Sequence, residues 1–523
     1  MRTRNDLILA DLVAGRAETH PDLEVLTFEH LSLDGGATPD EVRTYADLHR
    51  NGTRIAAALR ARGVARGDRF ALMMRNHPEF VETMIAASVT GAIFVPIDPR
   101  TRGHQLAYLL AHSGCVGLVC ADESLGAVAA IRDRVPELRW TLVRETTLAE
   151  ALARGGPTVD PCNDDPGAPL QIMYTSGTTG DPKGIVGANL RFCAAGMLGA
   201  LFGYRPDERP YSGLSLTHGN AQAVTLAPAL TMGLRAVFSP RFTKSRLWDV
   251  CRAHGCTTFS LVGGMATALY SEPARADDAD HAVRLVVSGG MPPALWRAFE
   301  ERFGVAILEF YGAMDGGGMA YKPVGEGPVG SFGKPMPGIE MTILDADGGE
   351  CPPGAVGEIC VRPAGGGAAE VEYHGNPEAS RAKIRGGWNR SGDMGHRDAE
   401  GWLFFDYRAG GGLRRNGDFI DPSVVEKALA ELAEVDDVFV YGVPAASGAP
   451  GERDLVAAIV PARGGRIDPA AAFAACQRAL AENAVPTWLQ VVDEIPKTAS
   501  EKPQARMLLA DFDPHAANVY RRR

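Results

Sequence analysis

Short apolar runs alternate with amphipathic runs through the first three quarters of the chain, and this alternation restricts the fold more than any other feature. Three of the apolar runs read as strands: residues 68–74 (DRFALMM), 92–97 (AIFVPI) and 116–121 (VGLVCA). The runs between them, residues 78–91 and 102–114, have helical spacing and end in glycine. Apolar strands between amphipathic helices predict parallel sheets that are covered on both faces. The same rhythm returns within residues 245–312, so we expect a large α/β body.

The pattern changes from about Gly338 onward. Residues 339–362 read as short strands broken by Asp-Gly and Pro-Gly turns, which predicts a small barrel or meander. A glycine-rich segment at residues 407–418 precedes a helix-like run at 422–435, two strand-like runs and a second helix-like run. We therefore predict a body of residues 1–408 and a cap of residues 409–523, with a hinge at about 408–411.

Composition excludes several classes of function. The 523 residues include 53 Lys and Arg against 64 Asp and Glu, and a net charge of −11 argues against binding to nucleic acid or to an anionic membrane. No window approaches the run of about 20 apolar residues that a spanning helix needs, and we identify no secretory signal. The nine cysteines include no CxxC pair, so we expect buried, reduced thiols in a cytoplasmic protein.

The stretch Met173–Val186 (MYTSGTTGDPKGIV) carries three glycines, four serine or threonine side chains and one lysine. Glycine permits a close backbone approach, and clustered N–H and O–H donors form a concave surface that suits phosphate oxygens. Lys183 adds a positive charge, but Pro182 stands where a Walker A loop has glycine. The flanking apolar runs predict a strand, a loop and a second strand. A surface hairpin without a ligand is the alternative, and the density of donors argues against it.

Residues 174–184 (YTSGTTGDPKG) closely resemble the phosphate loop of the acyl-adenylate-forming superfamily, which includes acyl-CoA synthetases, peptide-synthetase adenylation domains and luciferases. Further segments resemble the family's other signatures in the same order: residues 44–81, SGGMPP at 288–293, YGAMDGG from Tyr311, GWNRSGDMG at 387–395 and IPKTASEKPQAR at 495–506. The spacing is most similar to medium-chain, aryl and carnitine-type CoA ligases. The resemblance implies a body of two layered αβαβα-type sheets plus a small β-barrel, and a small, mobile α+β cap.

In this family a carboxylate attacks the α-phosphorus of ATP to give acyl-AMP and pyrophosphate, so positioning and cationic stabilisation carry the catalysis. The resemblance assigns ATP and AMP contacts to Thr175, Ser176, Gly177, Thr178, Thr179, Gly180, Lys183, Gly289, Gly290, Met291, Tyr311, Gly312, Met314, Asp393, Arg408 and Lys502. It assigns catalysis to Lys502, Thr179 and Lys183. It also implies that Tyr311 stacks on the adenine and that Asp393 accepts hydrogen bonds from the ribose hydroxyls.

The other implied sites are smaller. The acyl pocket would include His218, Gly219, Gly264, Gly312 and Ala313. Gly417 would line the CoA tunnel, and Asp315 would bind Mg²⁺. Three of the predicted site residues could instead have a purely structural role. His218 reads equally well as a core histidine, Asp393 as a residue that caps a turn, and Lys502 as a solvated surface lysine.

Five positions depart from the family pattern. Met314 replaces a threonine and removes a hydroxyl, and Glu501 replaces the glycine before Lys502. Gly410 and Gly411 stand in place of two aspartates near the hinge, and Arg414 replaces a lysine. Consecutive glycines raise the entropy cost of ordering a loop. We therefore expect adenylation to survive, with thioester formation as the weaker step. An eroded cap loop of this kind resembles the adenylating member of a ligase pair in platensimycin-type diterpenoid pathways.

Three hypotheses about function follow. The first is an acid–CoA ligase that uses ATP, Mg²⁺ and CoA. The second is an adenylating enzyme that passes acyl-AMP to a partner ligase. The third is an inactive nucleotide-binding homologue, which intact Lys183, Asp393 and Lys502 argue against. The apolar stretches 216–233 and 259–270 favour a bulky, mostly apolar acid, and no early aspartate is present for an amino-acid substrate. The sequence leaves the oligomeric state open, with a homodimer as one alternative.

Overall fold

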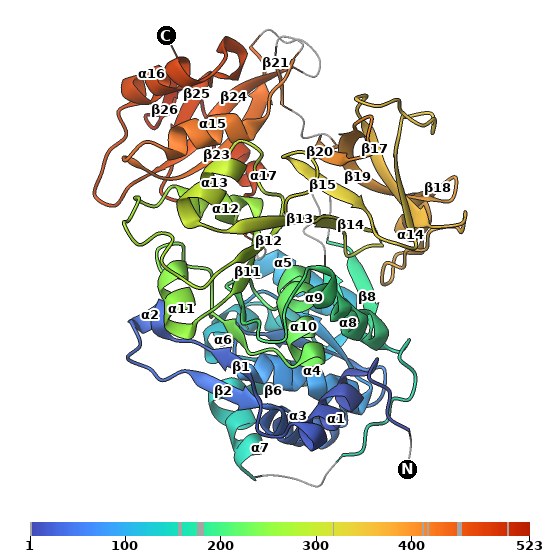
Figure 1. The fold of residues 1–523 in the computed structure, drawn as a ribbon. Coiled ribbons are helices and arrows are strands. Elements are labelled where there is room, and N and C mark those ends of the chain that lie inside the picture. Colours follow the sequence, from blue (N-terminus) through green and yellow to red (C-terminus); the bar gives the residue numbers. More distant parts are fainter. Residues whose placement is uncertain are drawn as a thin grey trace. The chain divides into compact units, whose positions relative to one another are not determined.

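The computed structural model describes residues 3–154, 159–174, 182–316, 318–409, 413–415, 418–446, 452–498 and 501–522 (Figure 1). The chain forms two compact units. Unit 1 comprises Met1–Ser260, His281–Val283 and Val371–Ala382, and unit 2 comprises Leu261–Asp280, Arg284–Glu370 and Lys383–Arg523.

Unit 1 contains a six-stranded sheet in the order β6 (Trp140–Val143), β5 (Cys115–Cys120), β3 (Arg69–Met73), β4 (Ile93–Pro96), β7 (Pro169–Tyr174) and β8 (Gly184–Ala188). Every pairing is parallel except β7 with β8. Consecutive residues of β3 and β5 are buried, because protein covers both faces of a parallel sheet. This confirms the prediction from the alternating sequence pattern.

Helices cover this sheet and pack on one another. Helix α3 (Tyr45–Arg60) packs on α4 (Pro78–Thr90) at Gly52, where a Cβ atom would lie 2.6 Å from Ile85. Helix α4 ends at Gly91, which has a left-handed backbone (φ 66°) as the sequence predicts. Helix α5 (Gly103–Ser113) places Leu106 and Leu110 in a core with Met73 and Val95.

A second group of strands in unit 1 has the order β9 (Pro210–Ser212), β10 (Ala236–Phe238), β1 (Glu24–Phe28) and β2 (Glu41–Thr44). The start of β11 (Thr258–Val262) pairs in parallel with β9. Helix α11 (Leu247–His254) precedes β11, as the second stretch of alternating sequence predicts.

Unit 2 begins with α12 (Gly263–Tyr270) and a parallel pair, β12 (Leu285–Gly289) and β13 (Ala306–Gly312), linked by α13 (Trp296–Phe303). The neighbouring strands are antiparallel and follow in the order β14 (Met319–Lys322), β15 (Ser331–Pro335), β20 (Leu403–Arg408), β19 (Trp388–Arg397), β17 (Gly357–Pro363) and β16 (Ile339–Leu344). Phe332, Ile343 and Ile359 lie in their core. The turn-rich sequence after Gly338 therefore forms short antiparallel strands.

The C-terminal residues form a four-stranded sheet of β23 (Val435–Pro444), β24 (Arg453–Pro461), β25 (Trp488–Val491) and β26 (Val519–Arg521) (Figure 1). Helices α15 (Pro422–Ala430) and α16 (Pro469–Ala479) share one core with it, and α17 (Ala505–Ala510) contributes Leu508 to another. Helix α15 ends five residues earlier than the predicted run, because Val435 starts β23 and is buried there.

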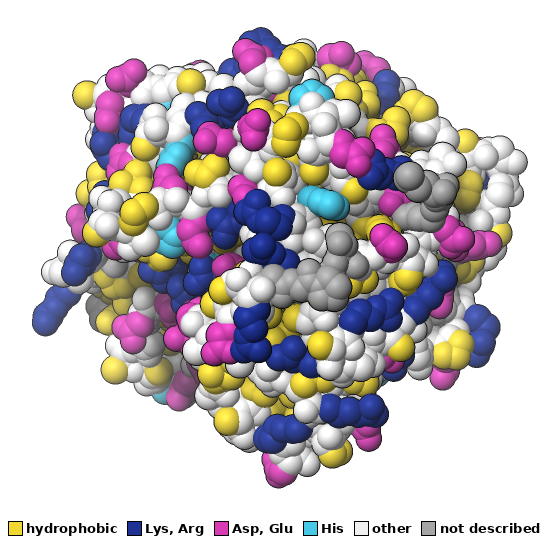
Figure 2. Space-filling model, turned by 90° about the horizontal axis from the view of Figure 1, so that it is seen from below, with side chains coloured by type: hydrophobic (Ala, Val, Ile, Leu, Met, Phe, Trp, Pro, Cys, Tyr) yellow, Lys and Arg dark blue, Asp and Glu magenta, His cyan; other side chains and the backbone are white. Residues whose placement is uncertain are grey.

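Three further expectations concern the cysteines, membrane-spanning helices and the distribution of charge on the surface. All nine cysteines are free thiols, and eight of them are buried. Within the described ranges, none of the helices is long and apolar enough to cross a bilayer. On the face viewed in Figure 2, Lys and Arg side chains are interspersed with acidic and apolar ones.

Candidate active site

The predicted phosphate-loop hairpin is present. Strands β7 and β8 are antiparallel, and the pair Tyr174 and Gly184 closes the loop between them. Strand β7 also pairs with β4, which anchors the hairpin to the parallel sheet of unit 1. The predicted contacts Thr175, Ser176, Gly177, Thr178, Thr179 and Gly180 lie outside the described residues.

Lys183 lies at the exit of this loop against an aromatic group that sequence reasoning missed. Its Nζ lies 5.1 Å from the centre of the Tyr373 ring, within the range of a cation–π contact. Tyr373 forms a bridge with Ile185, and the backbone N–H of His374 donates to the carbonyl of Gly184 (2.8 Å). The segment around Tyr373 therefore extends the hairpin and fixes the start of β8.

Polar contacts brace the entry strand as well. Nδ1 of His112 lies 2.8 Å from the hydroxyl of Tyr174, and the hydroxyl of Tyr108 donates to the carbonyl of Pro182 (3.2 Å). The rings of Tyr108 and His112 stack with centroids 5.1 Å apart. Because α5 and the hairpin are far apart in sequence, no local motif predicts these contacts.

Asp393 is the centre of a polar cluster in unit 2. It lies on β19 opposite Arg408 of β20, and Arg408 Nη1 forms an ion pair with its Oδ1 (2.9 Å). The hydroxyl of Tyr311 donates to Oδ2 (2.7 Å), and the backbone N–H of Asp393 donates to Ser391 Oγ (2.9 Å). The Asp393 side chain is 8% exposed while the Arg408 side chain is 53% exposed. The structure thus brings together three residues that the sequence assigns to one nucleotide.

Tyr311 has a neighbour that the sequence did not predict. Its ring stacks on Phe332 with centroids 4.6 Å apart. Burial raises the pKa of the Tyr311 hydroxyl well above its usual value, and the nearby Asp393 charge acts in the same direction. Tyr311 therefore stays a neutral donor to Asp393. The stacking of Tyr311 on adenine stays a prediction.

Lys502 is carried by a tight hairpin at the C-terminal end of the chain. Lys497 and Pro503 form the bridge at its base, and the N–H of Thr498 donates to the carbonyl of Lys502 (2.8 Å). Glu501 has a left-handed backbone (φ 57°), which is rare for a residue with a side chain. Gly264 of α12 packs on this hairpin, because a Cβ there would lie 3.1 Å from the carbonyl of Glu501.

Two charged residues of the Asp393 cluster, Asp393 and Arg408, act on the ammonium of Lys502. Burial by the surrounding protein lowers the pKa of Lys502. The negative charge of Asp393 raises this pKa, and the positive charge of Arg408 lowers it further. Water still reaches the residue, so solvent screening limits the size of the shift. Asp393 and Arg408 are therefore electrostatic neighbours of Lys502, and the catalytic role of this lysine stays a prediction.

Asp315, the predicted Mg²⁺ ligand, lies beside a cation that the sequence analysis missed. Lys383 Nζ is 2.8 Å from its Oδ2 and donates to the carbonyl of Ser391 (3.2 Å). The described part of the chain contains no cluster of three or more His, Cys, Asp or Glu side chains that would hold a metal by itself. Mg²⁺ is commonly held by one or two carboxylates together with substrate phosphates. One carboxylate therefore fits an ion that arrives with ATP, and Asp315 as its ligand stays a prediction.

The remaining predicted residues divide between the units. His218 and Gly219 lie in unit 1, and His218 Nδ1 accepts from the N–H of Asn220 (3.3 Å). Gly264, Gly312, Ala313 and Met314 lie in unit 2. The hinge glycines Gly410 and Gly411 and the tunnel residue Gly417 lie outside the described residues, and Arg414 begins the short strand β21 (Arg414–Arg415).

Comparison with known proteins decides the family. Residues 13–367 match the AMP-binding enzyme family, and residues 424–502 match the AMP-binding enzyme C-terminal domain. The chain belongs to the AMP-binding enzyme family. The match to the C-terminal domain ends at Lys502.

Relatives cover nearly the whole chain. The medium/long-chain-fatty-acid–CoA ligase FadD17 of Mycobacterium marinum is 30% identical over 90% of this chain and 92% of its own. The sulfoacetate–CoA ligase of Cupriavidus necator is 30% identical over 96% of this chain and 97% of its own. The crystal structure of the anthranilate CoA ligase AuaEII with anthranoyl-AMP is 24% identical, with a TM-score of 0.82 over 96% of both chains. This AMP-binding enzyme therefore has the α/β fold of that structure, with a large N-terminal part of sheets and a small C-terminal α+β part.

Proposed function

We propose that this AMP-forming acid–CoA ligase activates a bulky, mostly apolar carboxylic acid to acyl-AMP, with transfer to CoA as its weaker step. The observation that carries the proposal is the cluster of Asp393, Tyr311, Arg408 and Lys502 in one unit. A buried carboxylate that already accepts from a hydroxyl suits the two hydroxyls of a ribose. The cations beside it suit the phosphate that is attached to that ribose.

In the proposed mechanism, one oxygen of the substrate carboxylate attacks the α-phosphorus of ATP. The bond from that phosphorus to the bridging oxygen of pyrophosphate breaks, and pyrophosphate leaves with the bonding electrons. Lys502 stabilises the negative charge that develops on the α-phosphate, an effect that typically contributes about 2.7–4 kcal/mol for a single donor. The family resemblance assigns the departing phosphates to Lys183, whose Nζ lies 5.1 Å from the centre of the Tyr373 ring. Mg²⁺ bound with ATP would neutralise phosphate charge, with Asp315 as its protein ligand.

The choice of substrate rests on this chain's apolar residues. Phe259, Leu261 and Met265 are buried in the stretch that leads into α12, and Leu216, Val224 and Leu226 are buried in the other predicted pocket stretch. Of the relatives reported above, FadD17 is named as a medium- and long-chain fatty acid ligase and the AuaEII structure contains an aromatic acyl-AMP. The sulfoacetate ligase has a small anionic substrate by name, so relatedness alone does not select the acid. We propose an aromatic, long-chain or polycyclic acid, a diterpenoid acid among them.

A second candidate function is adenylation alone, with a partner ligase completing the thioester. The hinge glycines Gly410 and Gly411 favour it, because they replace acidic residues where the cap of residues 409–523 would rotate against the body.

The test is pyrophosphate release from ATP and Mg²⁺ with a panel of acids. The panel pairs each apolar monocarboxylic acid with a dicarboxylic acid of similar size. We expect release with apolar acids only, and loss of release in Lys502→Ala. Addition of CoA to the active pairs then separates the candidates, since a complete ligase forms acyl-CoA while an adenylating enzyme accumulates acyl-AMP. Release that is equal for dicarboxylic acids would contradict the proposed substrate class.

A further inference from the structure

Glu309 is a buried carboxyl group with no part in the proposed chemical step. It lies on β13 and is 4% exposed. Strand β13 pairs in parallel with β12, and the register places Glu309 beside Ser288. On its other side it pairs with β14, opposite Lys322. Because β12 ends at Gly289, Glu309 lies next to the first residues of the loop that follows.

The Glu309 carboxylate holds this loop by its backbone. The N–H of Gly290 donates to Oε1, and the N–H of Met291 donates to Oε2 (3.1 Å). Gly290 has φ 102°, a conformation that favours glycine. The carbonyl of Gly290 packs on α12, since a Cβ on Gly263 would lie 2.3 Å from it. The peptide is therefore confined between the start of a helix and a carboxylate.

The charge state of Glu309 determines whether its carboxyl group can accept both hydrogen bonds from the N–H groups of Gly290 and Met291. Burial raises the pKa of Glu309 to about 7, while the two backbone donors and the Lys322 charge oppose the rise. Lys322 is itself buried, and its Nζ lies 4.2 Å from the centre of the Trp296 ring. An ionised carboxylate accepts at both oxygens, whereas a protonated one turns one oxygen into a donor. Both loop bonds are therefore complete only when Glu309 is ionised.

We propose that Glu309 is a positioning residue of the nucleotide site: its carboxylate fixes the backbone of Gly290 and Met291 so that this loop is preformed for the adenine of ATP and AMP. The inference rests on the proposed function, which assigns the loop to adenine. Glu309 does not contact the nucleotide and acts only through the loop. A role confined to stability would lower the free energy of unfolding without a selective effect on adenine-containing ligands.

The test is calorimetric binding of AMP and of inorganic tripolyphosphate to wild type and to Glu309→Gln. The amide of glutamine turns an N–H towards one of the loop N–H groups, so we expect the Kd for AMP to rise about tenfold. Tripolyphosphate lacks a base, so its Kd should not change. We also expect wild type to bind AMP more tightly as pH rises through about 7, relative to Glu309→Gln at each pH. This comparison cancels the titration of AMP itself.

Glu29→Gln is the matched control. Glu29 is also fully buried, and it accepts from the N–H of Ser32 (2.8 Å) and from its hydroxyl (2.5 Å), but it lies in unit 1 and outside the predicted site. We expect this variant to lose stability and keep the wild-type Kd for AMP. Equal weakening of AMP binding in both variants would overturn the proposal. So would a folded Glu309→Gln that binds AMP as wild type does.

Hydrogen exchange keeps the proposal testable if Glu309→Gln does not fold. In wild type the amides of Gly290 and Met291 should be protected, and more strongly above the Glu309 pKa of about 7 than below it, after correction for the intrinsic rate. Exchange of both amides at intrinsic rates would overturn the proposal. Wild-type protein that binds neither AMP nor ATP would instead refute the proposed function itself.

Discussion

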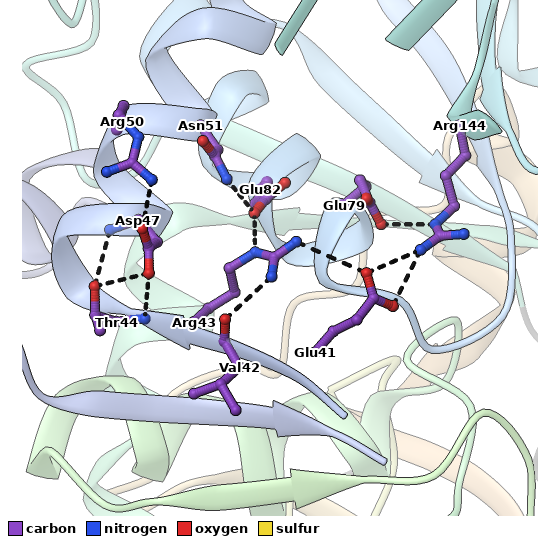
Figure 3. A network of polar contacts seen from close by, with 10 residues as sticks. All are labelled: Glu41, Val42, Arg43, Thr44, Asp47, Arg50, Asn51, Glu79, Glu82 and Arg144. Atoms are coloured by element: carbon purple, nitrogen blue, oxygen red, sulfur yellow. Dashed lines mark hydrogen bonds and ion pairs between the residues drawn. The ribbon is translucent and has the colours of Figure 1, made fainter. Parts of the chain in front are cut away.

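Each unit contains a network of ion pairs, and the two networks differ in how far their cations are exposed to solvent. In unit 1, Arg43 Nε donates to Glu82 (2.7 Å), and Arg144 connects Glu79 (2.8 Å) with Glu41 (3.1 Å) (Figure 3). In unit 2, Asp393 pairs with Arg408 and accepts from Tyr311. Both networks centre on buried carboxylates, so burial alone does not distinguish a structural network from a binding site.

The exposure of the cations makes the distinction. The Glu82 side chain is 0% exposed and its partner Arg43 only 19%, so protein groups balance both charges. Asn51 donates a further hydrogen bond to Glu82 (2.7 Å), which ties α3 to α4 (Figure 3). Arg408 is 53% exposed and Lys502 is reached by water. Charges that still contact solvent retain the capacity to bind an anionic ligand, and this difference favours the network of unit 2 as the proposed site.

The largest effect should come from breaking the network of unit 1. We expect Arg43→Met to lower the free energy of unfolding by about 3–5 kcal/mol, because it leaves Glu82 buried without its cation. Burial already raises the pKa of Glu82. A group whose pKa is raised by folding stabilises the folded state at low pH and loses that contribution as pH rises. The deficit should therefore shrink on acidification.

Denaturant unfolding of Arg43→Met across pH measures this effect. The double variant Arg43→Met/Glu82→Gln is the control, because it removes the uncompensated charge, and it should recover part of the loss. A double variant that is as unstable as Arg43→Met would show that packing, and not charge, dominates this network.

A slightly smaller effect should follow from the removal of a cation in the network of unit 2. We expect Lys502→Ala to slow acid-dependent pyrophosphate release by about 10²–10³-fold, or about 2.7–4 kcal/mol, without loss of stability. Since the pKa of Lys502 lies below its usual 10.5, the wild-type rate should begin to fall at a lower pH than that of an ordinary lysine. A pH–rate profile that is flat through the alkaline range would contradict this assignment.

Replacement of the central carboxylate should have a moderate effect. Asp393→Asn removes an ionised acceptor from Tyr311, Arg408 and the proposed ribose, so AMP affinity should fall by about 1.5–3 kcal/mol. Asp406→Asn is the control, because Asp406 forms a comparable pair with His396 (2.9 Å) on the same two strands. Calorimetric titration with AMP separates the two variants. Similar losses in both would mean that Asp393 acts only through the sheet.

The smallest effect should come from the backbone beside Lys502. Glu501→Gly relieves a left-handed residue (φ 57°), and we expect about 1 kcal/mol of stabilisation in thermal or chemical unfolding. Glu501→Ala separates strain from charge, because it removes the carboxylate but retains the Cβ. If Glu501→Ala stabilises as much as Glu501→Gly, then charge and not backbone strain is the cost at this position.

Much of the fold could be predicted because it is encoded by local patterns. The apolar run DRFALMM forms β3, and glycine ends α4 as its sequence indicates. The hairpin around the phosphate loop follows from two apolar runs with a donor-rich segment between them. The end of α15 was less predictable, because Val435 continues the helical spacing of the sequence but is the first residue of β23 and lies in the core.

The sequence by itself determined which residues we propose to carry the chemistry, since Lys183, Asp393 and Lys502 lie in contiguous motifs whose spacing is readable along the chain. Only the tertiary structure decided which residues support them. Tyr373 lies against Lys183, and Lys383 against Asp315. Glu309 reaches the loop after β12 because the strand register places it there. Such contacts join residues far apart in sequence, so they depend on sheet register and packing, which no single stretch of sequence specifies.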